Sequence, residues 1–250
     1  MISGAELVVK ALIEEKVEVC FAYPGGQAID LFDALYQREE FRVILPRHEQ
    51  GLIHAADGFA RSTGKVGVCL VTSGPGATNL ITGIATAGYD SSPLVCITGQ
   101  VSTHLIGKDA FQEVDMVGIC RSIAKYAVTV RKREDLGRIL KKAFVIAQSG
   151  KPGVVVVDIP KNIQQELGSE KYPKEVAIRG GQKTQMIPLK KLETAAEILE
   201  AAKKPVMLLG GGIHRAWAYK EIVSFIDKYN LPIVSTIMGK GSLSSNHPNY

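Results

Sequence analysis

Short apolar runs alternate with amphipathic segments through residues 1–160. Four apolar runs, at residues 17–22, 66–72, 94–98 and 154–159, have the length and continuity of strands that are buried on both faces. Weaker strands are predicted at 42–45 and 126–130. Helical spacing of apolar residues predicts helices at 5–13, 29–36, 48–62, 77–87 and 134–148. The alternation predicts an α/β fold, a doubly wound parallel sheet with helices on both faces.

A second unit begins after a change in composition. Between residues 161 and 187 the periodicity fades and the chain becomes polar, as in a linker. A helix at 189–202, a strand at 206–209, a glycine triplet, a helix at 216–229 and a strand at 233–236 then follow. Two strands bury too little surface for a self-sufficient core. We therefore expect a domain at 1–165, a linker at 166–187 and a partial, truncated domain at 188–250.

Charge and cysteine content narrow the class of protein. The net charge of +5 comes from 30 basic and 25 acidic residues, spread along the chain with only short runs such as 131–133. Nucleic-acid-binding proteins concentrate basic charge, so that class is disfavoured, and no apolar run is long enough to span a membrane. Cys20, Cys69 and Cys96 lie inside apolar runs without a CxxC pair, which indicates a reducing compartment, most simply the cytoplasm.

Three turns that directly follow predicted strands are the candidates for chemistry. They lie at residues 23–26, 46–51 and 72–79, and should gather at one edge of the sheet, where α/β proteins bind ligands. Glu49 follows a strand and opens a helix there; it is a candidate catalytic carboxylate, or simply an acidic residue that suits a helix N-terminus. The glycines of the other two turns let backbone approach a flat or anionic ligand, or serve structure alone. The five histidines show no metal-ligand spacing, so no metal site is predicted in this chain.

In combination, these segments resemble the acetolactate synthase group of thiamine-diphosphate enzymes. The resemblance extends from about residue 3 to residue 250. The matching stretches are YPGG at 23–26, RHEQG at 47–51, HAADGFAR at 54–61, GKVGVCLVTSGPGATNL at 64–80, PLVCITGQV at 93–101, DAFQEVD at 109–115, GKPGVVVVDIPK at 150–161, GGGI at 210–213 and STIMGKG at 235–241.

The resemblance implies a role for individual residues. Glu49 matches the glutamate that hydrogen-bonds N1′ of the cofactor's aminopyrimidine ring, with Gly26 and Gln112 as further catalytic residues. Phe111 and Gln112 match residues on the substrate side. The implied cofactor contacts are Tyr23, Pro24, Gly25, Glu49, Pro75 and Asn79 for thiamine diphosphate, and Lys151, Gly210, Gly211 and Met238 for a flavin.

The resemblance also implies an activity and partners. Pyruvate would be decarboxylated and joined to a second 2-keto acid, pyruvate or 2-ketobutyrate, in branched-chain amino-acid synthesis. The fold would be a pyrimidine-binding domain followed by the start of a Rossmann-like domain. The implied cofactors are thiamine diphosphate, Mg²⁺ at a site outside this chain, and FAD. Homodimers or tetramers would form through the pyrimidine-binding domain, with a small regulatory subunit as a further partner.

Several alternatives remain at this stage. Lys151 stands where the family has arginine in a Gly-Arg-Pro-Gly flavin contact, and lysine lacks the flat guanidinium fork, which favours a flavin-free, catabolic-type acetolactate synthase. Another thiamine-diphosphate 2-keto-acid decarboxylase or carboligase is a second alternative. A non-catalytic nucleotide-binding or dimerisation module is a third. Because the diphosphate-binding domain of the family lies beyond residue 250, the 250-residue chain alone is expected to be inactive.

Overall fold

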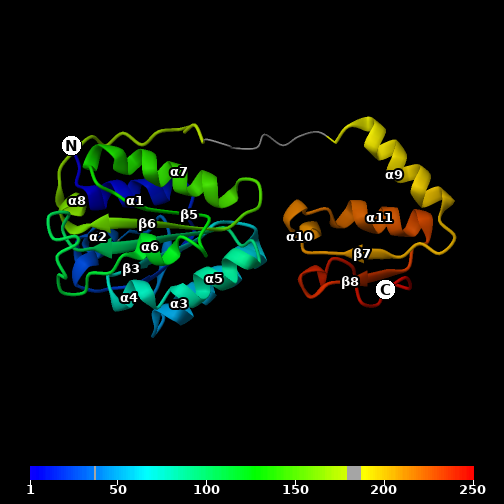
Figure 1. Cartoon of the computed structure of the whole chain (residues 1–250), viewed down its shortest axis with the longest axis horizontal. Helices are drawn as coiled ribbons and strands as arrows, with labels where there is room; N and C mark the ends of the chain where they lie inside the picture. Colours follow the sequence, from blue (N-terminus) through cyan, green and yellow to red (C-terminus); the bar gives the residue numbers. More distant parts are fainter. Residues whose placement is uncertain (37, 179–186) are drawn as a thin grey trace. The chain divides into compact units, whose positions relative to one another are not determined.

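The computed structural model describes residues 1–36, 38–178 and 187–250. These residues belong to two compact units, one that includes residues 1–178 and one that includes residues 187–250 (Figure 1). Residues 166–178 of the predicted linker lie along the first unit, where Gly168 pairs with Ile2 and the Tyr172 hydroxyl donates a 2.7 Å hydrogen bond to Glu15. Residues 179–186 of that linker lie outside the described residues.

Six parallel strands form the sheet of the first unit, in the order β2-β1-β3-β4-β6-β5. The three central strands β3, β4 and β6 are buried along their whole length, which explains their continuous apolar sequence. The fold class predicted from the sequence is therefore confirmed. The strands are β1 (Val19–Tyr23), β2 (Arg42–Ile44), β3 (Gly67–Val71), β4 (Leu94–Gln100), β5 (Tyr126–Thr129) and β6 (Val154–Pro160).

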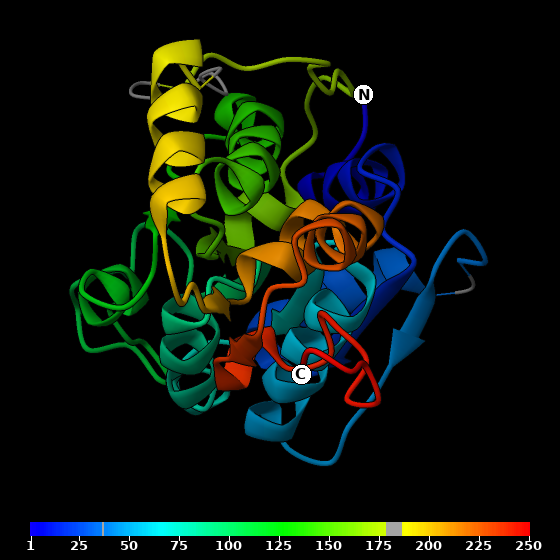
Figure 2. The same cartoon turned by 90° about the vertical axis from the view of Figure 1, so that its right-hand side faces the viewer.

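Helices cover both faces of this sheet, and each face has its own apolar core. One core lies under α1, α2, α7 and α8, and the other under α3, α5 and α6. Helices α1 and α7 pack side by side on their face (Figure 1 and Figure 2). The helices are α1 (Gly4–Glu14), η1 (Gly26–Ala28), α2 (Ile29–Leu35), α3 (Glu49–Thr63), α4 (Pro75–Thr78), α5 (Ile81–Tyr89), α6 (Met116–Cys120), η2 (Arg133–Asp135), α7 (Leu136–Gln148) and α8 (Lys161–Gln165).

Local sequence signals fix several helix ends. The Ser3 hydroxyl accepts from the Glu6 N–H at 3.1 Å and the Glu6 carboxylate accepts from the Ser3 N–H at 2.7 Å, so the capping box that starts α1 is present. Gly64 ends α3 in the left-handed region, with φ 71°. In place of the helix predicted at 77–87 the structure has two helices, α4 and α5, and α4 begins at Pro75, where a missing N–H suits the first turn. The five-residue helices α6 and α8 were not predicted, since so few residues show no periodicity.

The second unit is a smaller α/β assembly. Two parallel strands, β7 (Met207–Leu209) and β8 (Ile233–Ser235), pair with each other. Its core consists of Leu209, Ile226, Ile233 and Leu243. The helices are α9 (Leu189–Ala201), α10 (Gly212–Ala216), α11 (Tyr219–Tyr229) and η3 (Ile237–Gly239).

Among the described residues, no helix has both the length and the apolar character that a bilayer-spanning segment needs. The same part of the chain contains no group of three or more His, Cys, Asp or Glu side chains arranged to hold a metal ion.

Candidate functional site

Glu49 is the first residue of α3, and it lies at the carboxyl edge of the sheet. His48 caps this helix, because its Nδ1 accepts a 3.1 Å hydrogen bond from the Gln50 N–H. The strand β2 ends at this edge of the sheet, and α3 begins a few residues later with Glu49 half-buried. A carboxylate at a helix N-terminus also interacts favourably with the helix dipole.

The turn after β3 holds the Glu49 carboxylate. Asn79 donates from Nδ2 to Glu49 Oε2 at 2.9 Å. A Cβ at Gly76 would lie 3.3 Å from Glu49 Oε1 and 2.8 Å from Thr72 Cγ2, so only glycine leaves the carboxylate its present position. Two segments thirty residues apart in sequence thus fix one carboxylate, as the parallel-sheet topology predicts.

The turn at 23–26, after β1, packs against the same threonine. A Cβ at Gly25 would lie 2.5 Å from Thr72 Cγ2, whereas a Cβ at Gly26 would meet no atom within 4 Å. Gly26 therefore presents bare backbone to the space beside the sheet edge. Tyr23 is half-buried and Pro24 is exposed. The three turns that the sequence singled out form one contiguous surface around Thr72.

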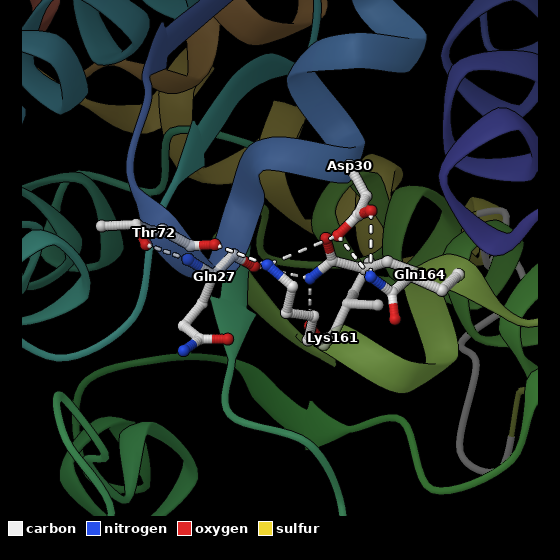
Figure 3. Close-up of polar contacts among 8 residues, drawn as sticks. Gln27, Asp30, Thr72, Lys161 and Gln164 are labelled. Atoms are coloured by element: carbon white, nitrogen blue, oxygen red, sulfur yellow. Dashed lines mark hydrogen bonds and ion pairs between the residues drawn. The ribbon is translucent and has the colours of Figure 1, made fainter.

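A polar cluster that the sequence did not reveal fixes the turn at 23–28 (Figure 3). The Gln27 N–H donates to Thr72 Oγ1 at 3.1 Å, and the Gln27 carbonyl accepts from Gln164 Nε2 at 2.8 Å. Lys161 Nζ donates to the Gly26 carbonyl at 3.0 Å and pairs with Asp30 at 3.8 Å. Thr72 follows β3 directly and Lys161 follows β6 directly, so the place of these two residues at the carboxyl ends of strands was the available signal.

Phe111 and Gln112 are brought to this edge by the long segment after β4. The Phe111 side chain is 84% exposed, and Gln112 has a positive φ of 60°. A Cβ at Gly74, itself at φ 54°, would lie 2.7 Å from the Gln112 carbonyl oxygen. The backbone of Gln112 therefore rests directly on the turn that leads to Pro75 and Asn79.

The site offers several hydrogen-bonding groups to a polar ligand. The Ser73 hydroxyl is buried and has no hydrogen-bond partner among the described residues. Buried polar atoms are normally hydrogen-bonded, so the orphaned hydroxyl of Ser73, in the same turn as Gly76 and Asn79, indicates a missing polar partner. The carboxylate of Glu49 and the amide of Asn79 supply an acceptor and a donor on the same surface.

The remaining candidates lie elsewhere. Lys151 precedes β6 and is exposed at the amino edge of the sheet, opposite the edge that carries Glu49. In the second unit, Gly210 and Gly211 follow β7 and Met238 lies in η3 after β8. A Cβ at Gly211 would lie 3.1 Å from the Met238 Cβ, so these residues do come together.

Comparisons with known families identify the class of protein that carries such a site. The family model "Thiamine pyrophosphate enzyme, N-terminal TPP binding domain" matches residues 2–119, and "Thiamine pyrophosphate enzyme, central domain" matches residues 192–250. The chain belongs to the thiamine pyrophosphate enzyme family. The first match ends before β5 and β6, but both strands belong to the same sheet as β1–β4.

Within that family the chain is similar to acetolactate synthase large subunits. It is 49% identical over 249 residues to the acetolactate synthase isozyme 3 large subunit of Escherichia coli K12, covering 99% of this chain and 43% of that protein. It is 46% identical to a probable acetolactate synthase large subunit of Methanococcus aeolicus, covering 98% and 41%. The corresponding subunit of Haemophilus influenzae is 48% identical, covering 98% and 43%. The chain thus spans less than half the length of these relatives.

Proposed function

We propose that the chain is the N-terminal part of the catalytic subunit of an acetolactate synthase. The reaction is the decarboxylation of pyruvate and the joining of its two-carbon unit to a second 2-keto acid, pyruvate or 2-ketobutyrate. One observation carries the proposal: Glu49 is held by Asn79 at 2.9 Å beside the bare backbone of Gly76 and an orphaned hydroxyl on Ser73. The similarity to acetolactate synthase large subunits supports it.

The residues of this chain bind and orient the pyrimidine half of thiamine diphosphate. The Glu49 carboxylate accepts a hydrogen bond from a ring nitrogen and controls the proton there, and Asn79 keeps the carboxylate in place. Gly25 and Gly26 leave room for the reacting centre, and Phe111 and Gln112 face the substrate. When bound, thiamine diphosphate supplies the carbon nucleophile and the electron sink for decarboxylation.

The other cofactors and partners belong to the same proposal. Mg²⁺ binds with the diphosphate at residues outside this chain, and FAD contacts Gly210, Gly211 and Met238. Catalytic subunits form dimers or tetramers through the pyrimidine-binding domain and associate with a small regulatory subunit, which the "large subunit" names of the relatives support. The four cysteines are free and buried, which supports a reducing, cytoplasmic location.

The test is Glu49→Gln in the full-length protein, assayed for acetolactate formation from pyruvate with saturating thiamine diphosphate and Mg²⁺. We expect kcat to fall by about 10²-fold or more, the scale of losing a positioned proton-transfer group. The matched control is Glu134→Gln, which changes an exposed glutamate at the start of another helix and should leave kcat unchanged. Wild-type kcat in the Glu49→Gln variant would refute the proposal, and so would a wild-type protein that forms no acetolactate.

A further inference from the structure

A row of polar side chains crosses the sheet at its carboxyl edge, within the core under α3, α5 and α6. Thr98, Asp158 and Thr129 are register partners on the adjacent strands β4, β6 and β5. Thr98 Oγ1 donates to Asp158 Oδ1 at 2.7 Å, and Thr129 Oγ1 donates to Oδ2 at 3.2 Å. Asp158 is 1% exposed. A carboxylate this deeply buried is costly unless it is fully hydrogen-bonded, so its donors are an essential part of its environment.

Gln100 links this buried carboxylate to the segment at 101–115. Its Nε2 donates to Asp158 Oδ2 at 3.1 Å and to the Val114 carbonyl at 2.9 Å, while its Oε1 accepts from the Val101 N–H at 2.9 Å. The side-chain amide of Gln100, a residue only 3% exposed, therefore connects the start of the segment at Val101 to its end at Val114.

Asp158, the Val114 carbonyl and the Val101 N–H together decide which way that amide points. If the Gln100 amide were reversed, its oxygen would face the Asp158 carboxylate and the Val114 carbonyl, and its NH₂ would face the Val101 N–H. All three contacts would then be repulsive, because acceptors would face acceptors and a donor would face a donor. An ionised Asp158 therefore adds one of the three contacts that keep Gln100 in the orientation that closes the segment.

The closed segment carries the two residues assigned to the substrate side. Glu113 accepts hydrogen bonds from the N–H groups of Gly107 and Ala110, which shapes the interior of the segment. The Gln112 backbone then rests on Gly74, in the turn that leads to Asn79. The chain of contacts runs without a break from Asp158, through Gln100, to the loop at the site.

We propose that Asp158 and Gln100 are positioning residues that hold residues 101–115 in the conformation in which Phe111 and Gln112 meet the substrate. This inference rests on the proposed function for the role of Phe111 and Gln112, but not for the closure of the segment itself.

The positioning of residues 101–115 should weaken as the pH falls. Burial raises the pKa of Asp158 to about 6, although the hydrogen bonds from Thr98, Gln100 and Thr129 oppose this effect. Other groups that face the carboxyl are Arg131, which follows β5, and the Cys120 thiol of α6. Below pH 6 a proton occupies Asp158, and a hydroxyl replaces one of the acceptors that orient Gln100. The segment should therefore loosen as the pH falls through about 6.

The first experiment measures amide hydrogen exchange on the unaltered full-length protein at pH 7.2 and pH 5.2, corrected for the intrinsic pH dependence of exchange. We expect protection of residues 101–115 to fall about 5-fold or more at pH 5.2, while the β3 strand at 67–71 stays protected. With a pKa of about 6, Asp158 is protonated in only roughly one molecule in twenty at pH 7.2 but in most molecules at pH 5.2, which gives the expected fold-change. Equal protection of residues 101–115 at both pH values would overturn the proposal, and so would a loss spread equally over β3.

The second experiment compares Gln100→Leu and Asp158→Asn with the matched control Thr129→Val, all in the full-length protein. Thr129→Val removes one contact of Asp158 without touching Gln100, so exchange and kinetics should change by less than about 3-fold. For the first two variants we expect faster exchange at residues 101–115 and a kcat/KM for pyruvate about 10-fold lower, since small misplacements of a substrate-positioning group reduce the rate strongly. Half-saturation by thiamine diphosphate should stay unchanged.

The outcomes separate this inference from the proposed function. Wild-type exchange at 101–115 in both Gln100→Leu and Asp158→Asn would refute the positioning role even if the enzyme is an acetolactate synthase. A loss of thiamine-diphosphate activation as large as the loss for pyruvate would also refute it, because a general structural defect gives that result. If the wild-type protein forms no acetolactate, the proposed function fails, but the exchange results still decide the closure of the segment.

Discussion

The buried carboxyl group of Asp158 makes a quantitative prediction about how the stability of the first unit depends on pH. Its pKa is about 6 in the folded chain, against an ordinary value of 3.8, because burial penalises the charged form. Between these two pH values the folded chain binds a proton that the unfolded chain does not bind. The stability from this proton is fully present below pH 3.8 and is lost as the pH rises through about 6.

The magnitude follows from the two pKa values. Their difference corresponds to about 3 kcal/mol in full, at about 1.4 kcal/mol for each pH unit. Asp158→Asn removes the titrating group and adds a constant offset from its imperfect hydrogen bonds. The free energy of unfolding of the wild type, minus that of Asp158→Asn, should therefore rise by about 1.3 kcal/mol between pH 7 and pH 5.

The assay is urea-induced unfolding at each pH, followed by a short thiol-labelling pulse. Cys69 and Cys96 are fully buried partners on β3 and β4, so they react only when the first unit unfolds. Asp33→Asn, at an exposed aspartate of α2, is the control. A wild-type-minus-Asp158→Asn difference that stays constant, or that falls between pH 7 and pH 5, would refute the reasoning.

Two further predictions concern the packing of α5 on α3 and the pairing of Ile2 with Gly168. Gly83→Ala should reduce the unfolding free energy of the chain by about 1–3 kcal/mol in urea titrations, because its Cβ would lie 2.1 Å from Ile53 Cγ2. The control is Gly58→Ala, whose Cβ meets no atom within 4 Å and which should not destabilise the chain. Arg133→Met should speed amide hydrogen exchange at Ile2 and Gly168 by about 10-fold or more, because the buried guanidinium donates to the Ile2 and Glu166 carbonyls. Unchanged exchange at these two amides would contradict the prediction.

The sequence predicted the fold class well because the signals were local and long. The apolar runs at β3, β4 and β6 could be only buried strands or buried helices, and their alternation with amphipathic segments selected the parallel sheet. The strand ends alone then placed Glu49, Gly25 and Asn79 at one edge of the sheet. Their roles in binding thiamine diphosphate remain predictions.

Short elements and single side chains were harder to predict. The five-residue helices α6 and α8 carry too few residues for a periodic pattern. Lys161 and Gln164 fell in the stretch where periodicity fades, yet they hold the turn at Gly26 and Gln27. No local pattern indicates that a residue after one strand bonds a turn 135 residues earlier.

By itself, the sequence determined which segments are buried, that the sheet is parallel, and which turns share its carboxyl edge, because these follow from hydrophobic periodicity and chain direction. Only the tertiary structure decided the environments of individual charges. Arg133 lies in a short basic run that resembles solvated surface, but it is 3% exposed and bonds four backbone carbonyls. Asp158 lies within the otherwise apolar strand β6, and its partners come from two neighbouring strands. Burial and hydrogen bonding join residues that are distant in sequence, so no local pattern could have identified them.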